Sequence, residues 1–145
     1  MSVEEANIAD LDDIQKICQD SLPIYYSLIE FLAYQISTDN FIYVVKKDKE
    51  VLGYLLANIK NKNIHILSIA ISKEHRSKKY GSILINEFCN KIKQKFNNIE
   101  SITLYVMMKN LKAIKFYIKN GFEFNSGIRN YYGPNNDALK LKKVL

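Results

Sequence analysis

Two kinds of hydrophobic spacing alternate along the chain, and together they predict both helices and strands. Apolar residues recur at every third or fourth position in residues 11–18 and 82–96, as on one face of an amphipathic helix. Two more helices are expected at residues 27–36, after Pro23, and at residues 110–120. Shorter runs rich in β-branched and aromatic residues predict strands at 1–5, 41–45, 51–59, 64–71, 101–107, 122–125 and 138–142.

Local signals mark the ends of these elements and suggest how they are arranged. Asp10 is expected to cap the first helix and Asn110 the last, which Gly121 ends. The order β-α-α-β-β-β-α-β-α-β-β predicts an α+β fold with a mixed, mostly antiparallel sheet flanked by helices. The strand–helix–strand unit across residues 64–107 can place two strands parallel.

The composition is that of one soluble globular domain, residues 1–145, with 48% hydrophobic and 25% charged residues. No apolar run approaches the roughly 20 residues of a membrane helix, and the acidic N-terminus lacks the layout of a signal peptide. Cys18 and Cys89 make no metal-ligand spacing, and each falls on an apolar helix face. We expect a cytoplasmic protein with reduced, buried cysteines, no metal and no membrane partner.

The net charge of +6 comes from 21 basic against 15 acidic residues. Nearly all the basic residues are scattered lysines, and no nucleic-acid motif accompanies them, so nucleic acid is not an expected partner. Two interpretations stay open: a solvated lysine-rich surface, or a general attraction for an anionic ligand.

One segment, residues 69–85, combines a β-branched strand, a polar loop and the start of a helix. A loop at a helix N-terminus directs several backbone N–H groups and the positive helix end at one point, which suits a phosphate or pyrophosphate. The loop has the spacing Arg76-x-x-Lys79-x-Gly81. This is neither the P-loop spacing nor the dinucleotide-binding glycine fingerprint.

The loop spacing resembles the Arg/Gln-x-x-Gly-x-Gly/Ala signature of the GNAT superfamily of N-acetyltransferases, which cradles the pyrophosphate of acetyl-coenzyme A. Residues 51–57 are similar to the family's Gly-Tyr/Phe strand. Residues 105–122 resemble its Asn-x-x-Ala-x-x-x-Tyr-x-x-x-Gly-Phe block, through Asn110, Tyr117 and Gly121. The resemblance implies a GNAT fold, in which two central parallel strands splay apart, with acetyl-coenzyme A in the gap as co-substrate. The cofactor-binding residues it implies are Ile69, Ala70, Ile71, Arg76, Ser77, Lys78, Lys79, Tyr80, Gly81, Ser82, Asn110 and Tyr117.

Two further segments resemble the N-terminal protein acetyltransferases of the ribosomal-protein alanine acetyltransferase type. Residues 129–132, Arg-Asn-Tyr-Tyr, followed by Asp137, are similar to the ending of those enzymes, and residues 22–26 to their substrate loop. The substrate-binding residues implied are Leu22, Pro23, Ile24, Tyr26, Tyr131 and Tyr132. The resemblance therefore implies a protein or peptide N-terminus as partner, and leaves monomer and homodimer open.

Acetyl transfer from a thioester to an amine needs a neutral amine, an oriented carbonyl and a proton donor for the leaving thiolate. Tyr117 falls where the family has its thiolate-facing tyrosine; the alternative is an ordinary packed helix residue. His65 and Tyr105 fall where close relatives keep catalytic groups. A histidine titrates near neutrality and can act as the base, while a tyrosine can hydrogen-bond the water between base and amine. His65 could also be a plain packed or surface residue.

Lys79 departs from the family, which usually has Gly there. A lysine there can still donate its backbone N–H if its φ is negative, and its ammonium adds positive charge, but its Cβ must point away from the ligand. Because neither cysteine looks catalytic, direct attack in a ternary complex is favoured over an acetyl-enzyme. The alternatives are an acetyltransferase for small-molecule amines or lysine side chains, and a coenzyme A-binding module without turnover.

Overall fold

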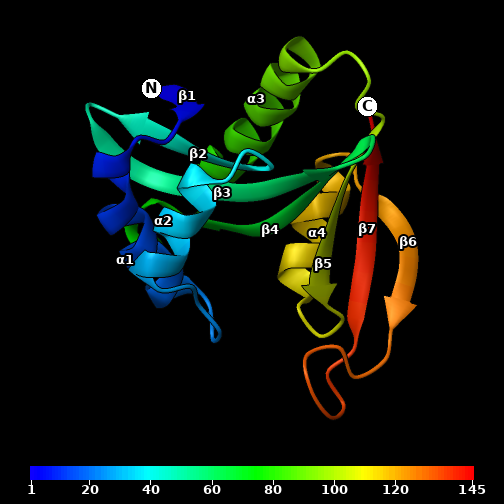
Figure 1. Ribbon diagram of the computed structural model, residues 1–145. Helices are drawn as coiled ribbons and strands as arrows, with labels where there is room; N and C mark the ends of the chain where they lie inside the picture. The colour runs from blue at the N-terminus through cyan, green and yellow to red at the C-terminus, as the bar shows by residue number, and fades with distance from the viewer.

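Seven strands form one mixed sheet in the order β1-β2-β3-β4-β5-β7-β6, in a computed structural model that describes residues 1–145 (Figure 1). All neighbouring strands are antiparallel except β4 and β5, which are parallel. The strands are β1 (Ser2–Glu5), β2 (Asn40–Lys47), β3 (Glu50–Lys60), β4 (Asn63–Ile71), β5 (Ser101–Met107), β6 (Glu123–Ile128) and β7 (Ala138–Val144). The α+β class and the single parallel pair predicted from the sequence are confirmed.

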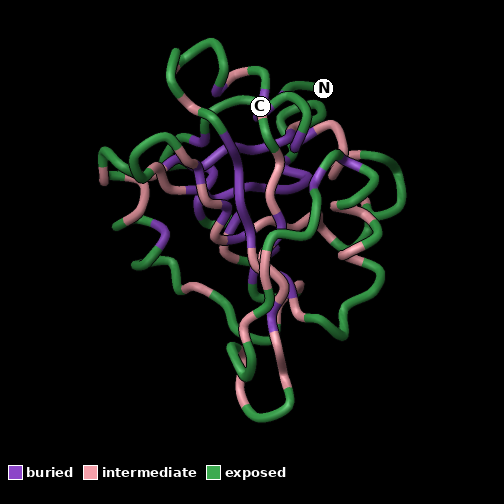
Figure 2. The backbone as a smooth tube through the Cα atoms, turned by 90° about the vertical axis from the view of Figure 1, so that its right-hand side faces the viewer, coloured by how far each residue is buried: buried purple, intermediate pink, exposed green.

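Helices cover both faces of the sheet, and each face has its own apolar cluster. On one face, Ile14 of α1 and Phe31 of α2 pack with Tyr54 of β3. On the other face, Phe88 of α3 packs with Leu55 and with side chains of β5, and α4 lies against the edge of this cluster. Figure 2 shows the buried centre of the sheet surrounded by exposed loops. The helices are α1 (Leu11–Ser21), α2 (Leu28–Ile36), α3 (Tyr80–Lys95) and α4 (Leu111–Lys119), with short 3-10 helices η1 (Ile8–Asp10) and η2 (Lys73–His75).

The two parallel strands separate halfway along their length. Pairing of β4 with β5 runs from Asn63 opposite Ser101 to Ile66 opposite Leu104, and stops there. Beyond that point β4 stays with β3, while β5 stays with β7. In Figure 1, strands β1 to β4 run across the molecule, whereas β5, β7 and β6 run down it. The splayed central strands are therefore confirmed.

A β-bulge in β4 lies at the point where the strands separate. The register between β3 and β4 shifts so that Leu56 faces Ser68 and Ala57 faces Ile66, which leaves Leu67 as the extra residue. A bulge reverses the alternation of side chains that follow it. Because of this reversal, all the isoleucines of β4 contact the cluster on the α3 face: Ile64, Ile66, Ile69 and Ile71.

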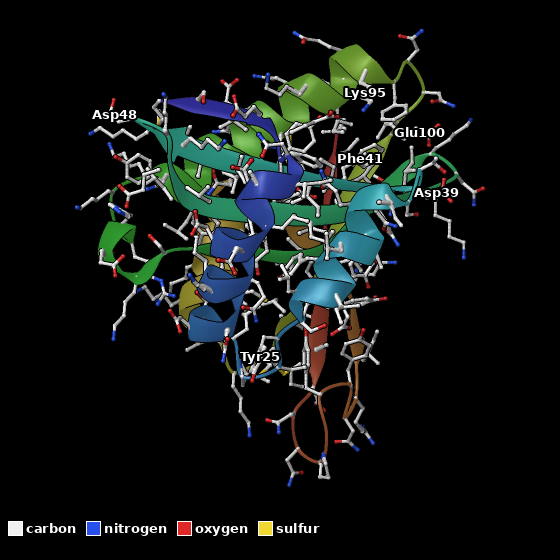
Figure 3. The ribbon with its side chains drawn as sticks, turned by 60° about the vertical axis from the view of Figure 1, so that its left-hand side comes forward. Tyr25, Asp39, Phe41, Asp48, Lys95 and Glu100 are labelled. Atoms are coloured by element: carbon white, nitrogen blue, oxygen red, sulfur yellow. The ribbon has the colours of Figure 1, made fainter.

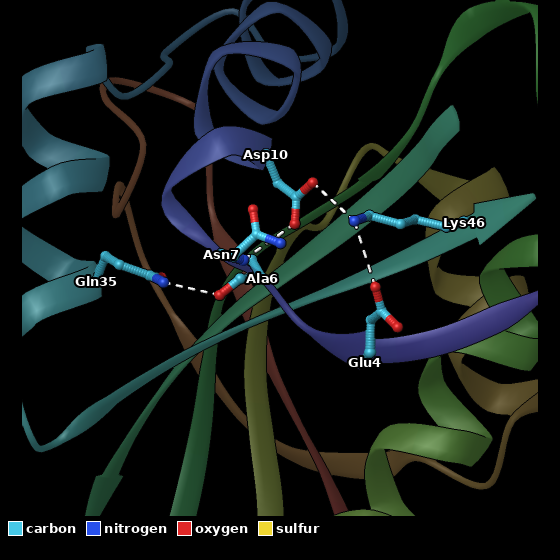
Figure 4. A network of polar contacts seen from close by, with 6 residues as sticks. All are labelled: Glu4, Ala6, Asn7, Asp10, Gln35 and Lys46. Atoms are coloured by element: carbon cyan, nitrogen blue, oxygen red, sulfur yellow. Dashed lines mark hydrogen bonds and ion pairs between the residues drawn. The ribbon is translucent and has the colours of Figure 1, made fainter. Parts of the chain in front are cut away.

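Several element boundaries differ from the sequence expectations by one to three residues. Helix α3 begins at Tyr80, two residues before the expected start, and the last two strands extend to Ile128 and Val144. Asp10 occupies the N-cap position of α1, as expected, but its side chain makes no cap hydrogen bond to that helix. Its carboxylate accepts the N–H of Asn7 at 3.0 Å and pairs with Lys46 at 2.8 Å, which ties η1 to β2 (Figure 4). None of the helices combines the length and apolar character needed to span a bilayer.

Candidate active site

The loop before α3 and the first turn of this helix expose a group of backbone donors. The six N–H groups of residues 77–82 have no hydrogen-bond acceptor within the protein, and the first bond of α3 runs from the N–H of Ile83 to the carbonyl of Lys79 at 3.1 Å. The helix that follows is 16 residues long, so its N-terminal end carries partial positive charge. This arrangement has the features of an anion site and fits a pyrophosphate.

The same loop contains two residues in the left-handed conformation. Ser77 has φ 63° and Lys79 has φ 69°. Lys79 therefore does not adopt the negative φ that the sequence suggested as the condition for its N–H to donate: a left-handed residue in this turn aims successive N–H groups at one point. Lys79 thus keeps the backbone conformation that glycine adopts easily, at a cost of about 1–2 kcal/mol for its Cβ.

Arg76 anchors this loop to two other elements. Its Nε donates to the carbonyl of Ile71 at 3.0 Å, and its Nη2 donates to the hydroxyl of Ser21 at 2.9 Å. The guanidinium therefore links the end of β4 to the end of α1. The Ile71 carbonyl, expected to be available to the coenzyme, is already used by this contact.

Gly81 provides space for a side chain of α4. A Cβ at Gly81 would lie 3.0 Å from Cζ of Phe116 and 3.8 Å from Cγ1 of Ile71. The glycine therefore lets the Phe116 ring reach the first turn of α3. In this structure Gly81 serves packing between the two helices that flank the gap between β4 and β5.

Four aromatic side chains form a continuous row near the point where β4 and β5 separate. The rings of His65 and Tyr105 lie 4.9 Å apart, those of Tyr105 and Tyr131 4.8 Å, and those of Tyr131 and Tyr132 4.9 Å. They come from β4, from β5 and from the loop between β6 and β7. Tyr132 in turn lies close enough to Tyr117 of α4 to perturb its ionisation. The structure thus brings together the three expected catalytic residues and two of the expected substrate residues.

Burial changes the protonation of this group. It raises the pKa of Tyr117 to about 12, and the nearby Tyr132 adds to the rise. It lowers the pKa of His65, and the charge of Lys140 lowers it further. At neutral pH Tyr117 therefore keeps its proton and His65 is neutral.

Behind His65 lies a chain of polar side chains that the sequence analysis did not identify. Nδ1 of His65 is 2.8 Å from the hydroxyl of Thr103, which also accepts from Nδ2 of Asn63 at 2.9 Å. The Asn63 carbonyl oxygen accepts from the hydroxyl of Ser101 at 2.8 Å. The parallel register places His65 opposite Thr103 and Asn63 opposite Ser101. The sequence pattern that could have indicated this polar chain is a pair of polar residues at alternate positions on each of two strands that were expected to be parallel.

The loop between β6 and β7 holds its tyrosines through its own hydrogen bonds. The Asp137 carboxylate accepts the N–H of Asn130 at 2.8 Å, and the Asn130 side chain accepts the N–H of Asn135 at 3.0 Å. The N–H of Tyr132 donates to the carbonyl of Asn136 at 3.0 Å. Asp137 and Asn130 therefore shape the loop that presents Tyr131 and Tyr132.

The expected substrate loop, residues 22–26, lies at the same end of the molecule as this tyrosine loop (Figures 1 and 3). Ile24 is 76% exposed. Tyr26, by contrast, packs edge-on against Phe31 at 5.7 Å and Tyr34 at 5.5 Å, so its ring lies against α2 and is not part of the aromatic row.

Two remaining side-chain expectations concern Asn110 and the cysteines. The Asn110 side chain accepts the N–H of Ala113 at 3.2 Å, which confirms it as the cap of α4. Cys18 and Cys89 are both buried, as predicted, and burial raises the pKa of Cys89. Cys89 is therefore a packed thiol and not an activated nucleophile.

A parallel strand pair that splays apart beside a helix start with free N–H groups is the architecture of the GNAT fold. Residues 8–122 match the acetyltransferase (GNAT) family. The chain belongs to this family and is a GNAT N-acetyltransferase. Enzymes of the family use acetyl-coenzyme A, and the free N–H groups of residues 77–82 fit its pyrophosphate.

Several known proteins are similar to this chain over nearly its whole length. An N-alpha-acetyltransferase of Sulfurisphaera tokodaii is 29% identical over 155 residues, covering 99% of this chain and 92% of its own length. An N-alpha-acetyltransferase of Saccharolobus solfataricus is 28% identical, covering 99% and 93%. Among solved structures, Ard1 from Thermoplasma volcanium superimposes with a TM-score of 0.86 at 25% identity, covering 99% and 97%.

Proposed function

We propose that the chain transfers the acetyl group of acetyl-coenzyme A to the α-amine of a protein or peptide N-terminus, by direct attack in a ternary complex. The relatives named N-alpha-acetyltransferase support this acceptor. The observation that carries the proposal is the meeting of Tyr117, His65 and Tyr105 with the tyrosines of the β6–β7 loop where β4 and β5 separate.

The coenzyme would lie along the unpaired edge of β4. From Leu67 to Ile71 this unpaired edge advances roughly 13 Å, at about 3.3 Å per residue. The N–H groups of residues 77–82 would hold the pyrophosphate at one end of this path. At the other end, the backbone of β4 beyond Ile66 is free of β5 and would pair with the amides of the pantetheine arm.

Tyr117 would supply the proton that the leaving thiolate takes. Its pKa is raised to about 12, so its hydroxyl is fully protonated at neutral pH. An alkyl thiolate is a weaker base than a buried tyrosinate, so the transfer needs the two groups in direct contact as the carbon–sulfur bond breaks. The helix start at Asn110 and the packing of Phe116 against Gly81 set the position of Tyr117.

The acceptor amine must be neutral to attack, and an α-amine has a pKa of about 8. We assign to His65 and Tyr105, whose rings are 4.9 Å apart, the role of holding the water that takes the proton of the amine. Tyr131 and Tyr132 would narrow the approach to this water.

A peptide array with radiolabelled acetyl-coenzyme A tests the acceptor. Peptides with free N-termini are compared with the same peptides blocked at the N-terminus and carrying an internal lysine, and with a polyamine. We expect label on the free N-termini alone. Label on the blocked peptides or the polyamine would move the acceptor to a lysine side chain or a small amine. Coenzyme A binding by calorimetry without acetylation of any of these acceptors would indicate a module without turnover.

A further inference from the structure

The polar chain behind His65 connects buried hydroxyl groups in a fixed sequence. Ser101 and Thr103 are 7% and 4% exposed, so their hydroxyl hydrogens cannot rely on water. The Ser101 hydroxyl has one acceptor, the Asn63 carbonyl oxygen. The Asn63 amide then donates to Thr103, which leaves the Thr103 hydrogen directed at Nδ1 of His65.

The opposite orientation of this chain leaves a donor without a partner. If Asn63 were turned over, Thr103 would donate to its carbonyl oxygen and accept from a protonated Nδ1 of His65. The Ser101 hydroxyl would then face an amide N–H and lose its only acceptor. A buried hydroxyl without an acceptor costs about 1–3 kcal/mol. Hydrogen-bond satisfaction therefore selects the first orientation.

We propose that Ser101, Asn63 and Thr103 act as positioning residues that hold neutral His65 in the tautomer with its proton on Nε2. His65 then offers an N–H donor, and not a lone pair, toward Tyr105 and the gap. The groups that face His65 are Lys140 of β7, Tyr105 of β5 and Asn58 of β3. None of these is an anion that would stabilise a second proton on the ring.

For catalysis, which rests on the proposed function, this changes the role of His65. The sequence suggested His65 as the base itself. With Nδ1 occupied by Thr103 and Nε2 protonated, His65 instead holds the water through a hydrogen bond. The amine nitrogen passes its proton to that water and the water passes a proton to solvent, while His65 keeps its own.

Nitrogen-15 NMR of the free protein tests the tautomer directly. The chain has only two histidines, and a His75→Gln variant assigns their signals. We expect the Nε2 of His65 to carry the proton and Nδ1 to be unprotonated at neutral pH. A proton on Nδ1, or two exchanging tautomers in similar amounts, would overturn the proposal. This readout needs no turnover, so it stands apart from any failure of the proposed function.

Variants of the polar side chains behind His65 should each change its nitrogen-15 signals in a different way. In Asn63→Asp the carboxylate only accepts, so Thr103 must donate to it and the proton of His65 should move to Nδ1. In Thr103→Val, His65 loses its fixed partner and should populate both tautomers, whereas Thr103→Ser should restore the wild-type spectrum. If Asn63→Asp left the proton on Nε2, the hydrogen bonds among Ser101, Asn63 and Thr103 would not control the tautomer of His65. The signal of His75, which pairs with Glu50 at 3.2 Å, is the internal control.

The rate profile separates a donor from a base. The value of kcat/KM should rise with pH through the pKa of the peptide α-amine, near 8. The same rise should remain in His65→Gln, whose side-chain amide still donates a hydrogen bond. Thr103→Val should lower kcat about 10-fold, the effect of one misplaced hydrogen bond, and Thr103→Ser should recover it. A rise that follows a histidine pKa and vanishes in His65→Gln would make His65 the base and contradict the proposal.

Discussion

Two loops flank the gap between β4 and β5, and they are built in opposite ways. The loop before α3 leaves the N–H groups of residues 77–82 without partners and places Ser77 and Lys79 at positive φ. The loop between β6 and β7 uses its own N–H groups internally, through Asp137 and Asn130, and presents tyrosine side chains. The first loop offers its backbone to a ligand, and the second offers its side chains.

This difference indicates where sequence changes should matter. A site made of backbone donors tolerates different side chains as long as the conformation is kept, so Lys79 can stand where the family has Gly. A site made of hydroxyl groups depends on each side chain and on the contacts that hold it. Changes in the first loop should therefore act on conformation and coenzyme affinity, and changes around the second on turnover and acceptor binding.

The largest effect is expected where the tyrosine loop meets α4. Tyr117→Phe keeps the ring against Phe116 and Phe122 but removes the proton, so kcat should fall by roughly 10²–10⁴ with little change in thermal stability. Steady-state kinetics and a thermal melt check this. Tyr43→Phe, which removes another tyrosine hydroxyl whose pKa is raised to about 12, is the control and should keep kcat. Wild-type turnover of Tyr117→Phe up to alkaline pH would make Tyr117 a packing residue only.

Gly81→Val tests whether the first loop can be damaged through packing alone. The new side chain would meet the Phe116 ring at 3.0 Å, so the free energy of unfolding should fall by about 1–3 kcal/mol together with coenzyme A affinity. Adding Phe116→Leu should recover part of the stability. Gly127→Ala, at a position with no contact closer than 3.9 Å, is the control. Lost affinity with unchanged stability would mean that Gly81 faces the phosphate and not Phe116.

Asp137→Ala tests the internal bonds of the second loop. Removing the carboxylate leaves the N–H of Asn130 without its acceptor, and Tyr131 and Tyr132 should become more mobile. We expect KM for the acceptor peptide to rise roughly 10-fold, as for the loss of a charge-assisted hydrogen bond, with coenzyme A affinity unchanged. Asp137→Asn retains an acceptor oxygen, so its KM for the acceptor peptide should lie between those of the wild type and Asp137→Ala. An equal loss of coenzyme affinity would contradict the separation of the two loops.

The smallest effect concerns the conformation of the first loop. Lys79→Gly removes the strain of a Cβ at φ 69°, offset by the greater freedom of glycine in the unfolded chain, so the protein should gain about 0.5–1 kcal/mol. Lys79→Ala removes the charge but keeps the Cβ and should not gain. Chemical denaturation measures both. If the two variants have equal stability, the positive φ at Lys79 carries no strain.

Much of the fold follows from local patterns in the sequence. Helices and strands were predicted in the right order because burial of one face imposes a spacing of 3.6 or 2 residues wherever the element forms. The cap at Asn110 was predicted for the same reason, since its acceptor and donor are three residues apart. The splay of β4 and β5 came from resemblance to a family and not from the spacing of residues.

What the sequence by itself determined is the set of elements, the two buried cysteines and the residue types available for chemistry. Only the tertiary structure decided the bulge at Leu67, the left-handed Lys79, the Phe116 ring beside Gly81 and the use of Asp10 by Lys46. The polar chain from Ser101 to His65 also exists only because two strands 38 residues apart pair in one register. These features depend on contacts between distant parts of the chain, and no local periodicity records which distant residue will be the neighbour.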